Sequence, residues 1–524
     1  MHFGFSYVGL IMLLMLLVPN FIWTKNQPKG YEEYASKENK ILLAFERVGQ
    51  FIVTPCALIF SDFNPKTWNI WCLVLILALL NLVVYDIAWV RYFKSEKTMK
   101  DFYRGFLGMP LALATYPVIA FYLLGVFGGN IIMILGSVIL GIGHIGIHAQ
   151  HAREVYGKKA KSRLPLRILK WIGIVILALV LIVLNTAIAG RSFKQVKRAI
   201  DYRNGVDENI YVELNGMEQY IWIMGMDTSN PIIISLHGGP GSPTGFCDYT
   251  YMDYLTDDYT FVIWDESGCG RSYYANQDVA PNNEGLTFES QEEDLDALVD
   301  YLCDRFGQDQ VIIMGHSYGT MLGSRYVFDH PEKVSQYIGI GQCINEVDWY
   351  GEIYSYEDAR ARAVEAGDDT TEMDAAYEAF RADDSLPNLM ALRAAVGPYH
   401  PQDVPTDTST WSAITCPTLG VDDARWYALE MTAMTGDSRF EELTAPLDEV
   451  LMMFDINDLG EEYPVPAHFI SGSDDWITPA GLVEEYANLH NYSYIPLEGC
   501  GHSPQAQLPE EFADAVQRCL SGQG

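Results

Sequence analysis

The chain has 524 residues, enough for more than one domain, and a formal net charge of −34 at pH 7. The charge is divided unevenly: residues 1–200 hold 22 Lys and Arg against 9 Asp and Glu, whereas residues 201–524 hold 12 against 59. An acidic half of this kind argues against nucleic acid as a partner, because phosphate binding requires a positive face. The nine cysteines lack the spacing of a zinc site. We therefore expect two domains, residues 1–195 and 196–524.

The first domain contains six apolar segments with the length and composition of transmembrane helices. They lie near residues 4–23, 41–60, 70–90, 106–126, 130–148 and 168–189. Lys and Arg collect in the first, third and fifth connections, which the positive-inside rule places in the cytoplasm. Four basic residues after the last segment argue the other way, but they are outnumbered. We predict an all-α six-helix transmembrane domain in the cell membrane, in contact with the lipid bilayer, with the acidic half extracytoplasmic.

Three histidines lie on one helical face at the end of the fifth predicted span: His144, His148 and His151. Such spacing could hold a metal ion or relay protons. The alternative is a helix end at the cytoplasmic interface. We favour the alternative, because the sequence places no carboxylate or cysteine with the histidines.

The sequence pattern of the acidic half predicts short strands that alternate with helices. Continuous apolar runs, typical of strands buried on both faces, occur at Pro231–Leu236, Thr260–Trp264, Val311–Met314, Tyr337–Ile340 and Ala467–Ile470. Before them, an Asn215-Gly216 turn joins two strands of a predicted hairpin. The pattern predicts an α/β domain with a mostly parallel sheet and helices on both faces, in which functional residues gather at the carboxyl ends of the strands.

A serine follows one of these strands in the sequence Gly315-His316-Ser317-Tyr318-Gly319, and a helical pattern begins directly afterwards. A strand, a tight turn and a helix in this order raise the serine hydroxyl above the sheet. The two glycines are required because a Cβ at either position would collide with neighbouring backbone. The backbone N–H of Tyr318, at the start of the helix, is a candidate donor to an oxyanion.

The strand Pro231–Leu236 ends in His237-Gly238-Gly239-Pro240-Gly241. Glycines leave the backbone free to pass close to a bound group, so the N–H groups of Gly238 and Gly239 are the other candidate oxyanion donors. An ordinary strand-to-loop turn is the alternative interpretation of this stretch.

A nucleophilic serine needs a histidine as base, and the histidine needs a carboxylate to orient it. Both follow predicted strands: Asp474 and Asp475 in the segment 472–479, and His502 in the segment 499–504. Ser317, Asp475 and His502 then occur in the chain order expected for a triad on an α/β-hydrolase sheet.

Four other residues could compete for these roles. His237 and His316 are each tied to their own loop, so we expect them to shape the oxyanion turn and the serine turn. Cys269 and Cys500 flank the site but have no base at a fixed spacing, which argues against a thiol nucleophile.

Five motifs together resemble those of the proline iminopeptidase family, which are serine aminopeptidases of the α/β-hydrolase fold. They are HGGPG at 237–241, DxxGxGRS at 265–272, GHSYG at 315–319, GxxDxxTP at 472–479 and GxGHSP at 499–504. The resemblance covers roughly residues 210–524. It implies that Ser317 is the nucleophile, His502 the base and Asp475, three residues before Thr-Pro, the orienting acid, with no cofactor. The sequence departs from the family at Glu266-Ser267, which bears on the substrate and leaves the triad unchanged.

Residues of about 343–460 interrupt the sheet between its sixth and seventh predicted strands. They contain acid-rich helical patterns at 356–366, 371–382 and 440–454. The resemblance implies a helical cap that roofs the site, with carboxylates that bind the free α-amine of a peptide. Glu346 is the candidate for that role, and a solvated residue at the start of a helix is the alternative.

These observations predict a membrane-anchored serine hydrolase that cleaves N-terminal residues from short peptides through an acyl-enzyme. An esterase or lipid hydrolase of the same fold is an alternative, because the triad does not distinguish esters from amides. A transporter or sensor with a ligand-binding hydrolase-like domain is another, and the complete catalytic set argues against it. The sequence leaves the oligomeric state open.

Overall fold

The computed structural model describes residues 3–65, 72–157, 164–400, 409–433, 438–451 and 453–522, with the backbone alone over 164–182. The chain forms two compact units, Met1–Lys197 and Arg198–Gly524. Each unit is described by itself.

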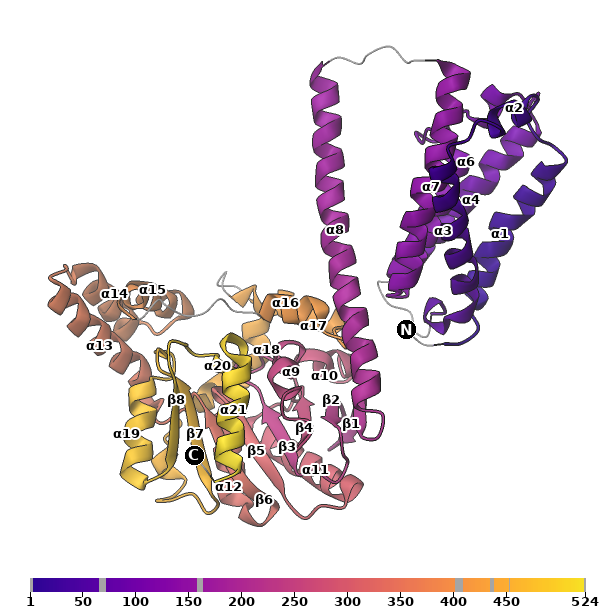
Figure 1. The fold of residues 1–524 in the computed structure, drawn as a ribbon. Coiled ribbons are helices and arrows are strands. Elements are labelled where there is room, and N and C mark those ends of the chain that lie inside the picture. Colours follow the sequence, from indigo (N-terminus) through magenta and orange to yellow (C-terminus); the bar gives the residue numbers. More distant parts are fainter. Residues whose placement is uncertain are drawn as a thin grey trace. The chain divides into compact units, whose positions relative to one another are not determined.

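The described part of the first unit is helical (Figure 1). Two glycine contacts bring its helices α3 and α7 together: a Cβ on Gly49 would lie 2.4 Å from the Cα of Leu140, and one on Gly143 would lie 2.2 Å from the backbone nitrogen of Glu46. Small residues of this kind let helix backbones approach closely. The helices are α1 (Tyr7–Thr24), α2 (Tyr31–Ala35), α3 (Lys40–Ile59), α4 (Cys72–Phe93), α5 (Met99–Phe102), α6 (Ala112–Phe127), α7 (Ile131–Tyr156) and α8 (Leu164–Asp201).

Four helices in the described part of this unit are long and apolar enough to cross a membrane, namely α1, α3, α4 and α7. The predicted span 106–126 is shorter than expected, because α6 has 16 residues and begins after Leu111, whose φ is 62°. The predicted span 168–189 falls within α8, and its side chains up to residue 182 lie outside the described part. A domain of six transmembrane helices therefore stays a prediction.

The histidines of α7 lie among carboxyl and phenol groups. The Nδ1 atom of His144 is 2.6 Å from Oε1 of Glu46, and Nδ1 of His151 is 2.8 Å from the hydroxyl of Tyr103. Nε2 of His151 is 3.6 Å from Oε1 of Glu38. The expectation that no carboxylate accompanies these histidines is wrong, because the fold brings the carboxylates of Glu38 and Glu46 to them from about 100 residues earlier in the chain. No group of three His, Cys, Asp or Glu side chains in the described residues is arranged to hold a metal ion.

The second unit is built on one eight-stranded sheet with the order β1-β2-β4-β3-β5-β6-β7-β8. The first two strands form an antiparallel hairpin, β2 pairs antiparallel with β4, and all later pairs are parallel, as predicted. Asn215 and Gly216 both have positive φ in the hairpin turn. The strands are β1 (Val206–Leu214), β2 (Met217–Gly225), β3 (Ile232–Leu236), β4 (Thr260–Trp264), β5 (Val311–His316), β6 (Val334–Ile340), β7 (Ala467–Gly472) and β8 (Ser493–Leu497).

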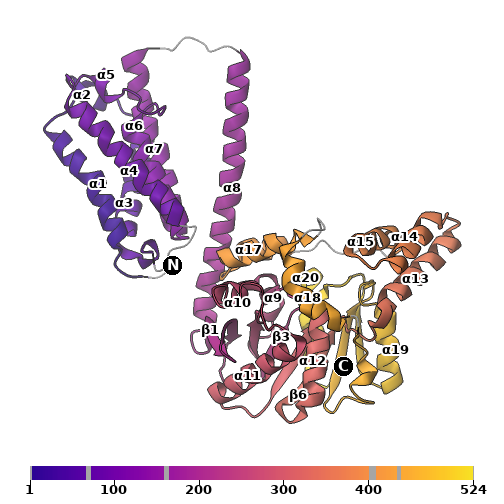
Figure 2. The same cartoon turned by 180° about the vertical axis from the view of Figure 1, so that it is seen from behind.

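Helices cover both faces of the sheet. One face packs against α9 (Gly245–Met252) and α21 (Pro509–Leu520), and α21 lies in front of the strands in Figure 1. The other packs against α11 (Phe288–Phe306), α12 (Tyr318–Asp329) and α19 (Ala480–His490), and α11 and α12 lie in front in Figure 2. The central strands β3, β4 and β5 are almost entirely apolar because both of their faces are buried.

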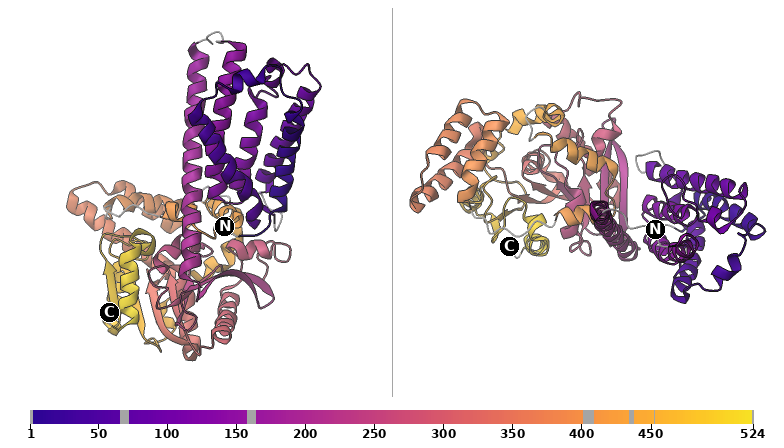
Figure 3. Two further views of the ribbon diagram at one scale, coloured as in Figure 1. Left: turned by 45° about the vertical axis from the view of Figure 1, so that its right-hand side comes forward. Right: turned by 90° about the horizontal axis from the view of Figure 1, so that it is seen from above.

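Two groups of helices lie between β6 and β7. The first group, α13 (Tyr350–Ala366), α14 (Thr371–Ala382) and α15 (Leu386–Val396), has its own small apolar core. The second group contains α16 (Ser409–Thr415), α17 (Val421–Glu430) and α18 (Arg439–Leu451). In Figure 3 the first group projects to one side of the sheet and the second lies over it. The predicted helix 371–382 is confirmed with the same bounds, whereas the predicted helix 440–454 ends earlier, at Leu451.

The second group is joined to the sheet domain through α10 (Gly270–Ala275). The guanidinium of Arg271 donates to both carboxylate oxygens of Asp423 at 2.7 and 2.5 Å, and both side chains are nearly buried. Trp426 also donates from its indole nitrogen to the carbonyl oxygen of Gly241, at 2.8 Å. These contacts hold α17 beside the loop that follows β3.

Candidate active site

Ser317 is the single residue between β5 and α12. Its φ and ψ are 52° and −122°, a strained conformation for a residue with a side chain. A Cβ on Gly315 would lie 2.3 Å from the carbonyl oxygen of Gly319, and one on Gly319 would lie 2.5 Å from that of Leu236. The predicted need for both glycines is confirmed, and the turn presents the serine hydroxyl at the carboxyl end of the sheet.

The three predicted triad residues lie within hydrogen-bond distance of one another. Nε2 of His502 is 3.0 Å from Oγ of Ser317, and Nδ1 of His502 is 3.0 and 3.1 Å from the two carboxylate oxygens of Asp475. Ser317 follows β5, Asp475 follows β7 and His502 follows β8, so the parallel strands bring them to one edge of the sheet. The arrangement lets the histidine accept the serine proton while the carboxylate fixes its tautomer.

Asp475 is held as a carboxylate by its surroundings. Its side chain is fully buried, and it accepts hydrogen bonds from the backbone N–H groups of Ile477 and Thr478 and from the Thr478 hydroxyl. Burial alone would raise the pKa of Asp475, but the charge of His502 and these hydrogen bonds hold it below its ordinary value. Thr478 also lies 3.2 Å from Nδ1 of His502, a contact that the sequence did not predict.

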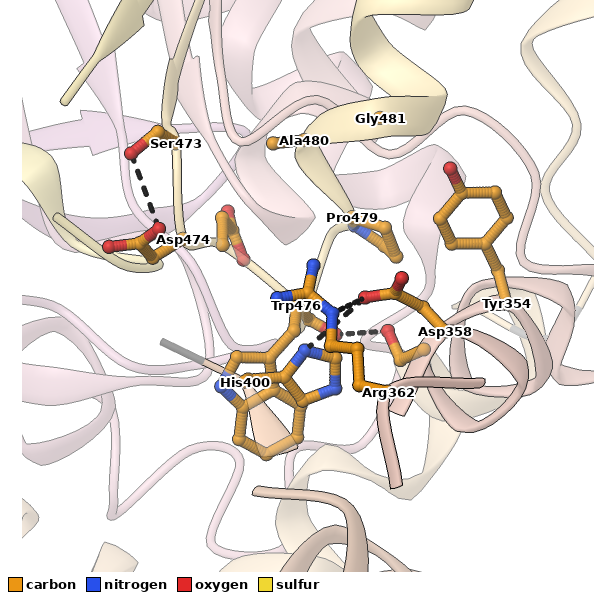
Figure 4. A pocket seen from close by; sticks show the side chains of 12 residues that line it. Tyr354, Asp358, Arg362, His400, Ser473, Asp474, Trp476, Pro479, Ala480 and Gly481 are labelled. Carbon is orange, nitrogen blue, oxygen red and sulfur yellow. Dashed lines mark hydrogen bonds and ion pairs between the residues drawn. The ribbon is translucent and has the colours of Figure 1, made fainter. Parts of the chain in front are cut away.

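The neighbouring Asp474 lines a cavity to which Ser317 and His502 do not contribute. Figure 4 shows Asp474 beside Ser473, 3.4 Å from its hydroxyl, in a pocket that also contains His400, Asp358 and Arg362. No hydrogen bond joins Asp474 to His502 in the described part of the chain. Of the two adjacent carboxylates, only Asp475 therefore has the geometry of the orienting acid.

The two rival histidines are bound to their own loops. Nε2 of His316 is 2.8 Å from the carbonyl oxygen of His502, and Nδ1 of His237 is 2.8 Å from that of Gly238. Burial, followed by the charge of His502, lowers the pKa of His316 to about 4, and burial also lowers the pKa of His237. Both rings are neutral supports of the backbone around Ser317.

The predicted oxyanion donors, Gly238, Gly239 and Tyr318, lie beside Ser317. Gly238 and Gly239 line the same cavity as Ser317, and Tyr318 begins α12 directly after it. Within the described residues, the backbone N–H groups of Gly239 and Tyr318 donate no hydrogen bond. Free donors beside the serine are what a tetrahedral oxyanion requires.

The serine opens into a cavity of about 290 Å³ that lies between the strand ends and the cap. Glu346 and Glu352 line it together with Arg393. Arg393 donates from Nε to Oε1 of Glu352 at 2.8 Å, whereas Oε2 of Glu352 is buried without a hydrogen-bond partner among the described residues. Burial, followed by the charge of Glu352, raises the pKa of Glu346 to about 8. With both glutamates ionised, the three side chains carry one net negative charge.

The cysteines near the site are thiols of low reactivity. Cys269 and Cys500 are buried, and burial raises the pKa of the Cys269 thiol well above its ordinary value and that of Cys500 to about 12. A thiol that stays protonated is a poor nucleophile. The hydroxyl of Ser317, 3.0 Å from Nε2 of His502, is therefore the better-placed candidate nucleophile.

Comparisons with known proteins give the family of the second unit. A family described as having the alpha/beta hydrolase fold matches residues 231–507, just over half of the chain. The probable aminopeptidase YbaC of Bacillus subtilis is 23% identical over 313 residues, which cover 59% of this chain and 94% of that protein. A proline iminopeptidase of Lactobacillus delbrueckii subsp. bulgaricus is 22% identical over 315 residues, covering 60% and 97%. Among solved structures, a proline iminopeptidase-related protein from Thermus thermophilus is 20% identical, covering 61% and 98%, with a TM-score of 0.42.

Proposed function

The chain belongs to the α/β hydrolase fold family, and we propose that it is a serine hydrolase that removes N-terminal residues from short peptides. The observation that carries the proposal is the continuous contact from Ser317 through His502 to Asp475, at the mouth of a cavity lined by acidic cap residues. The names of the two relatives, a probable aminopeptidase and a proline iminopeptidase, support the same reaction.

The proposed reaction has two halves. Oγ of Ser317 attacks the carbonyl carbon while Nε2 of His502 takes its proton, and the N–H groups of Gly239 and Tyr318 stabilise the oxyanion. His502 then gives the proton to the leaving amine, which leaves an acyl-enzyme. Water attacks the acyl group with His502 again as base, and Ser317 recovers its proton. These steps require no redox or group-carrying cofactor.

The acidic group in the cap accounts for selection of a free N-terminus. An α-ammonium group placed between Glu346 and Oε2 of Glu352 would favour the ionised form of Glu346, whose pKa is raised to about 8, and would donate to an acceptor that has no hydrogen-bond partner among the described residues. An ester without an amine offers neither interaction. The amine therefore distinguishes a peptidase from an esterase at this site.

We also propose that the first unit anchors the enzyme in the cell membrane, with the hydrolase domain extracytoplasmic. Four apolar helices and the alternation of basic loops support this arrangement. Protease added to intact cells should cleave the hydrolase domain. Cleavage only after the cells are permeabilised would refute the proposed side of the membrane.

The nucleophile is tested with a fluorophosphonate probe on the full-length protein in detergent. The probe should label the wild type and the control Ser242→Ala, whose serine lines the same cavity, but not Ser317→Ala. Equal labelling of all three proteins would refute the assignment of Ser317 as the nucleophile.

A further inference from the structure

Glu266 is a buried acid that the reaction above does not use. It follows β4 and its side chain is fully shielded from solvent. Oε2 accepts a hydrogen bond from the side-chain nitrogen of Gln291 at 3.0 Å, whereas Oε1 has no hydrogen-bond partner among the described residues. Burial raises the pKa of Glu266 to about 8. The group is therefore a neutral carboxylic acid at pH 7, with a proton to donate.

On one side, Glu266 faces the ring of His237. The Nδ1 atom of His237 contacts the carbonyl oxygen of Gly238, and a carbonyl only accepts, so Nδ1 carries the ring proton and Nε2 is an acceptor. Nε2 lies 3.4 Å from Sγ of Cys269 and 4.0 Å from Oε1 of Glu266. The thiol lies within hydrogen-bond distance of this ring nitrogen and, at 3.3 Å, of the carbonyl oxygen of Glu266. The Glu266 carboxyl faces the same nitrogen from 4.0 Å, beyond hydrogen-bond distance.

The ring of His237 in turn orients a peptide group of the oxyanion loop. The Gly238 carbonyl accepts from His237 and, at 3.2 Å, from the backbone N–H of Ser242. In a trans peptide the C=O and the following N–H point in opposite directions. Holding this carbonyl therefore turns the N–H of Gly239 away from His237 and Ser242, and leaves it free for a substrate oxygen.

On its other side, Glu266 is linked to the second oxyanion donor. Gln291 lies on α11, donates its amide N–H to Glu266 and accepts from the hydroxyl of Tyr318 at 2.7 Å. Gln291 and Tyr318 are both buried, so neither has water as a substitute partner. Tyr318 is the first residue of α12, and its backbone N–H is the donor that follows Ser317.

We propose that Glu266 is a positioning residue of the oxyanion hole: it holds the Tyr318 donor through Gln291 and faces His237 behind the Gly239 donor, and a negative charge on it weakens the hole. This inference rests on the proposed serine-hydrolase function. Ionisation places a negative charge behind the site where the tetrahedral oxyanion forms, and this charge slows the attack by Ser317.

Other titratable groups face this cluster and define the controls. Asp265 and Cys269 belong to the same turn, His316 faces His237 from the serine turn, and Glu430 faces His237 from α17. Burial raises the pKa of Asp265 only to about 6, so that group ionises in a lower range of pH than Glu266. Glu346, in the cavity, titrates in the same range as Glu266 and needs its own variant.

The test measures the rate of inactivation by a neutral fluorophosphonate from pH 6 to 9.5 with the full-length protein, because the probe needs the oxyanion hole but no amine subsite. The wild-type rate should fall about 30-fold between pH 7 and 9.5, as expected for loss of one proton with a pKa near 8. Glu266→Gln should keep the rate at pH 7 within about threefold and lose the alkaline decline, because the amide keeps a donor and cannot ionise.

Two variants serve as controls and should keep the decline. Glu346→Gln removes the other cavity acid, and Glu292→Gln removes an acid on α11 whose pKa burial and Asp329 raise to about 7. A decline that persists unchanged in Glu266→Gln, or that disappears in Glu346→Gln instead, would overturn the proposal.

A second variant, Gln291→Met, tests the same proposal if Glu266→Gln does not fold. The hydrogen bond from Gln291 lowers the pKa of Glu266, so Gln291→Met should move the decline to higher pH and slow the reaction about tenfold at pH 7. A midpoint that stays in place would refute the link. A wild type that the probe fails to label at any pH would instead refute the serine-hydrolase function itself.

Discussion

Replacing Glu346 by Gln tests how the cap recognises a substrate amine. The change keeps the size of the side chain and removes the charge next to Glu352 and Arg393. A hydrogen bond to a charged group contributes about 1.5–3 kcal/mol, which corresponds to about 10- to 100-fold in kcat/KM. The loss should apply to alanine p-nitroanilide, which has a free amine, and not to p-nitrophenyl acetate, which has none.

The size of this loss should depend on pH in a defined direction. The carboxyl of Glu346 has a pKa raised to about 8, so it must release its proton to form the ion pair below that pH. A peptide α-amine has a pKa of about 7.7–8.0 and loses its proton above that range. The ratio of wild-type to variant kcat/KM for the anilide should therefore be largest near pH 8 and shrink toward one at pH 6.

A matched control and two outcomes make the test decisive. Glu365→Gln changes an exposed glutamate on α13 and should leave both substrates unaffected. Equal losses on the anilide and the ester in Glu346→Gln would show general damage to the site. An unchanged anilide rate near pH 8 would refute the role of Glu346.

Three further predictions concern the triad and the framework. Asp475→Asn should lower kcat by about three to four orders of magnitude, whereas Asp474→Asn should change it less than threefold, and the reverse order would move the orienting acid by one residue. Gly319→Ala should lower the melting temperature and abolish probe labelling, because its Cβ would lie within 2.6 Å of two backbone carbonyl oxygens; a fully active variant would contradict the close packing. Arg271→Met should destabilise the protein by about 3–5 kcal/mol by leaving Asp423 buried without its partner, and adding Asp423→Asn should restore part of the melting temperature.

The strands and the triad could be predicted because their signals are local. A run such as Val311–Met314 is apolar at every position because it is buried on both faces. The glycines around Ser317 are required because a Cβ at either position would collide with backbone atoms close by. Parallel strands then bring residues far apart in the chain to one edge, which is why His502 and an aspartate could be placed with the serine from motifs at strand ends. The resemblance to proline iminopeptidases decided between Asp474 and Asp475.

The rest depends on contacts that no local pattern records. Glu352 and Arg393 pair across two cap helices, and Gln291 reaches Glu266 from a helix whose apolar spacing says only that it packs on the sheet. The carboxylates beside the α7 histidines were missed for the same reason, since Glu46 comes from a helix about 100 residues earlier.

The central claim is tested most directly by comparing three substrates with the full-length protein. Alanine p-nitroanilide should be cleaved by the wild type and not by Ser317→Ala, and the N-acetylated anilide should be cleaved at least tenfold more slowly because it has no amine for the cap glutamates. Hydrolysis of p-nitrophenyl acetate without cleavage of any anilide would contradict the aminopeptidase function and leave an esterase in its place.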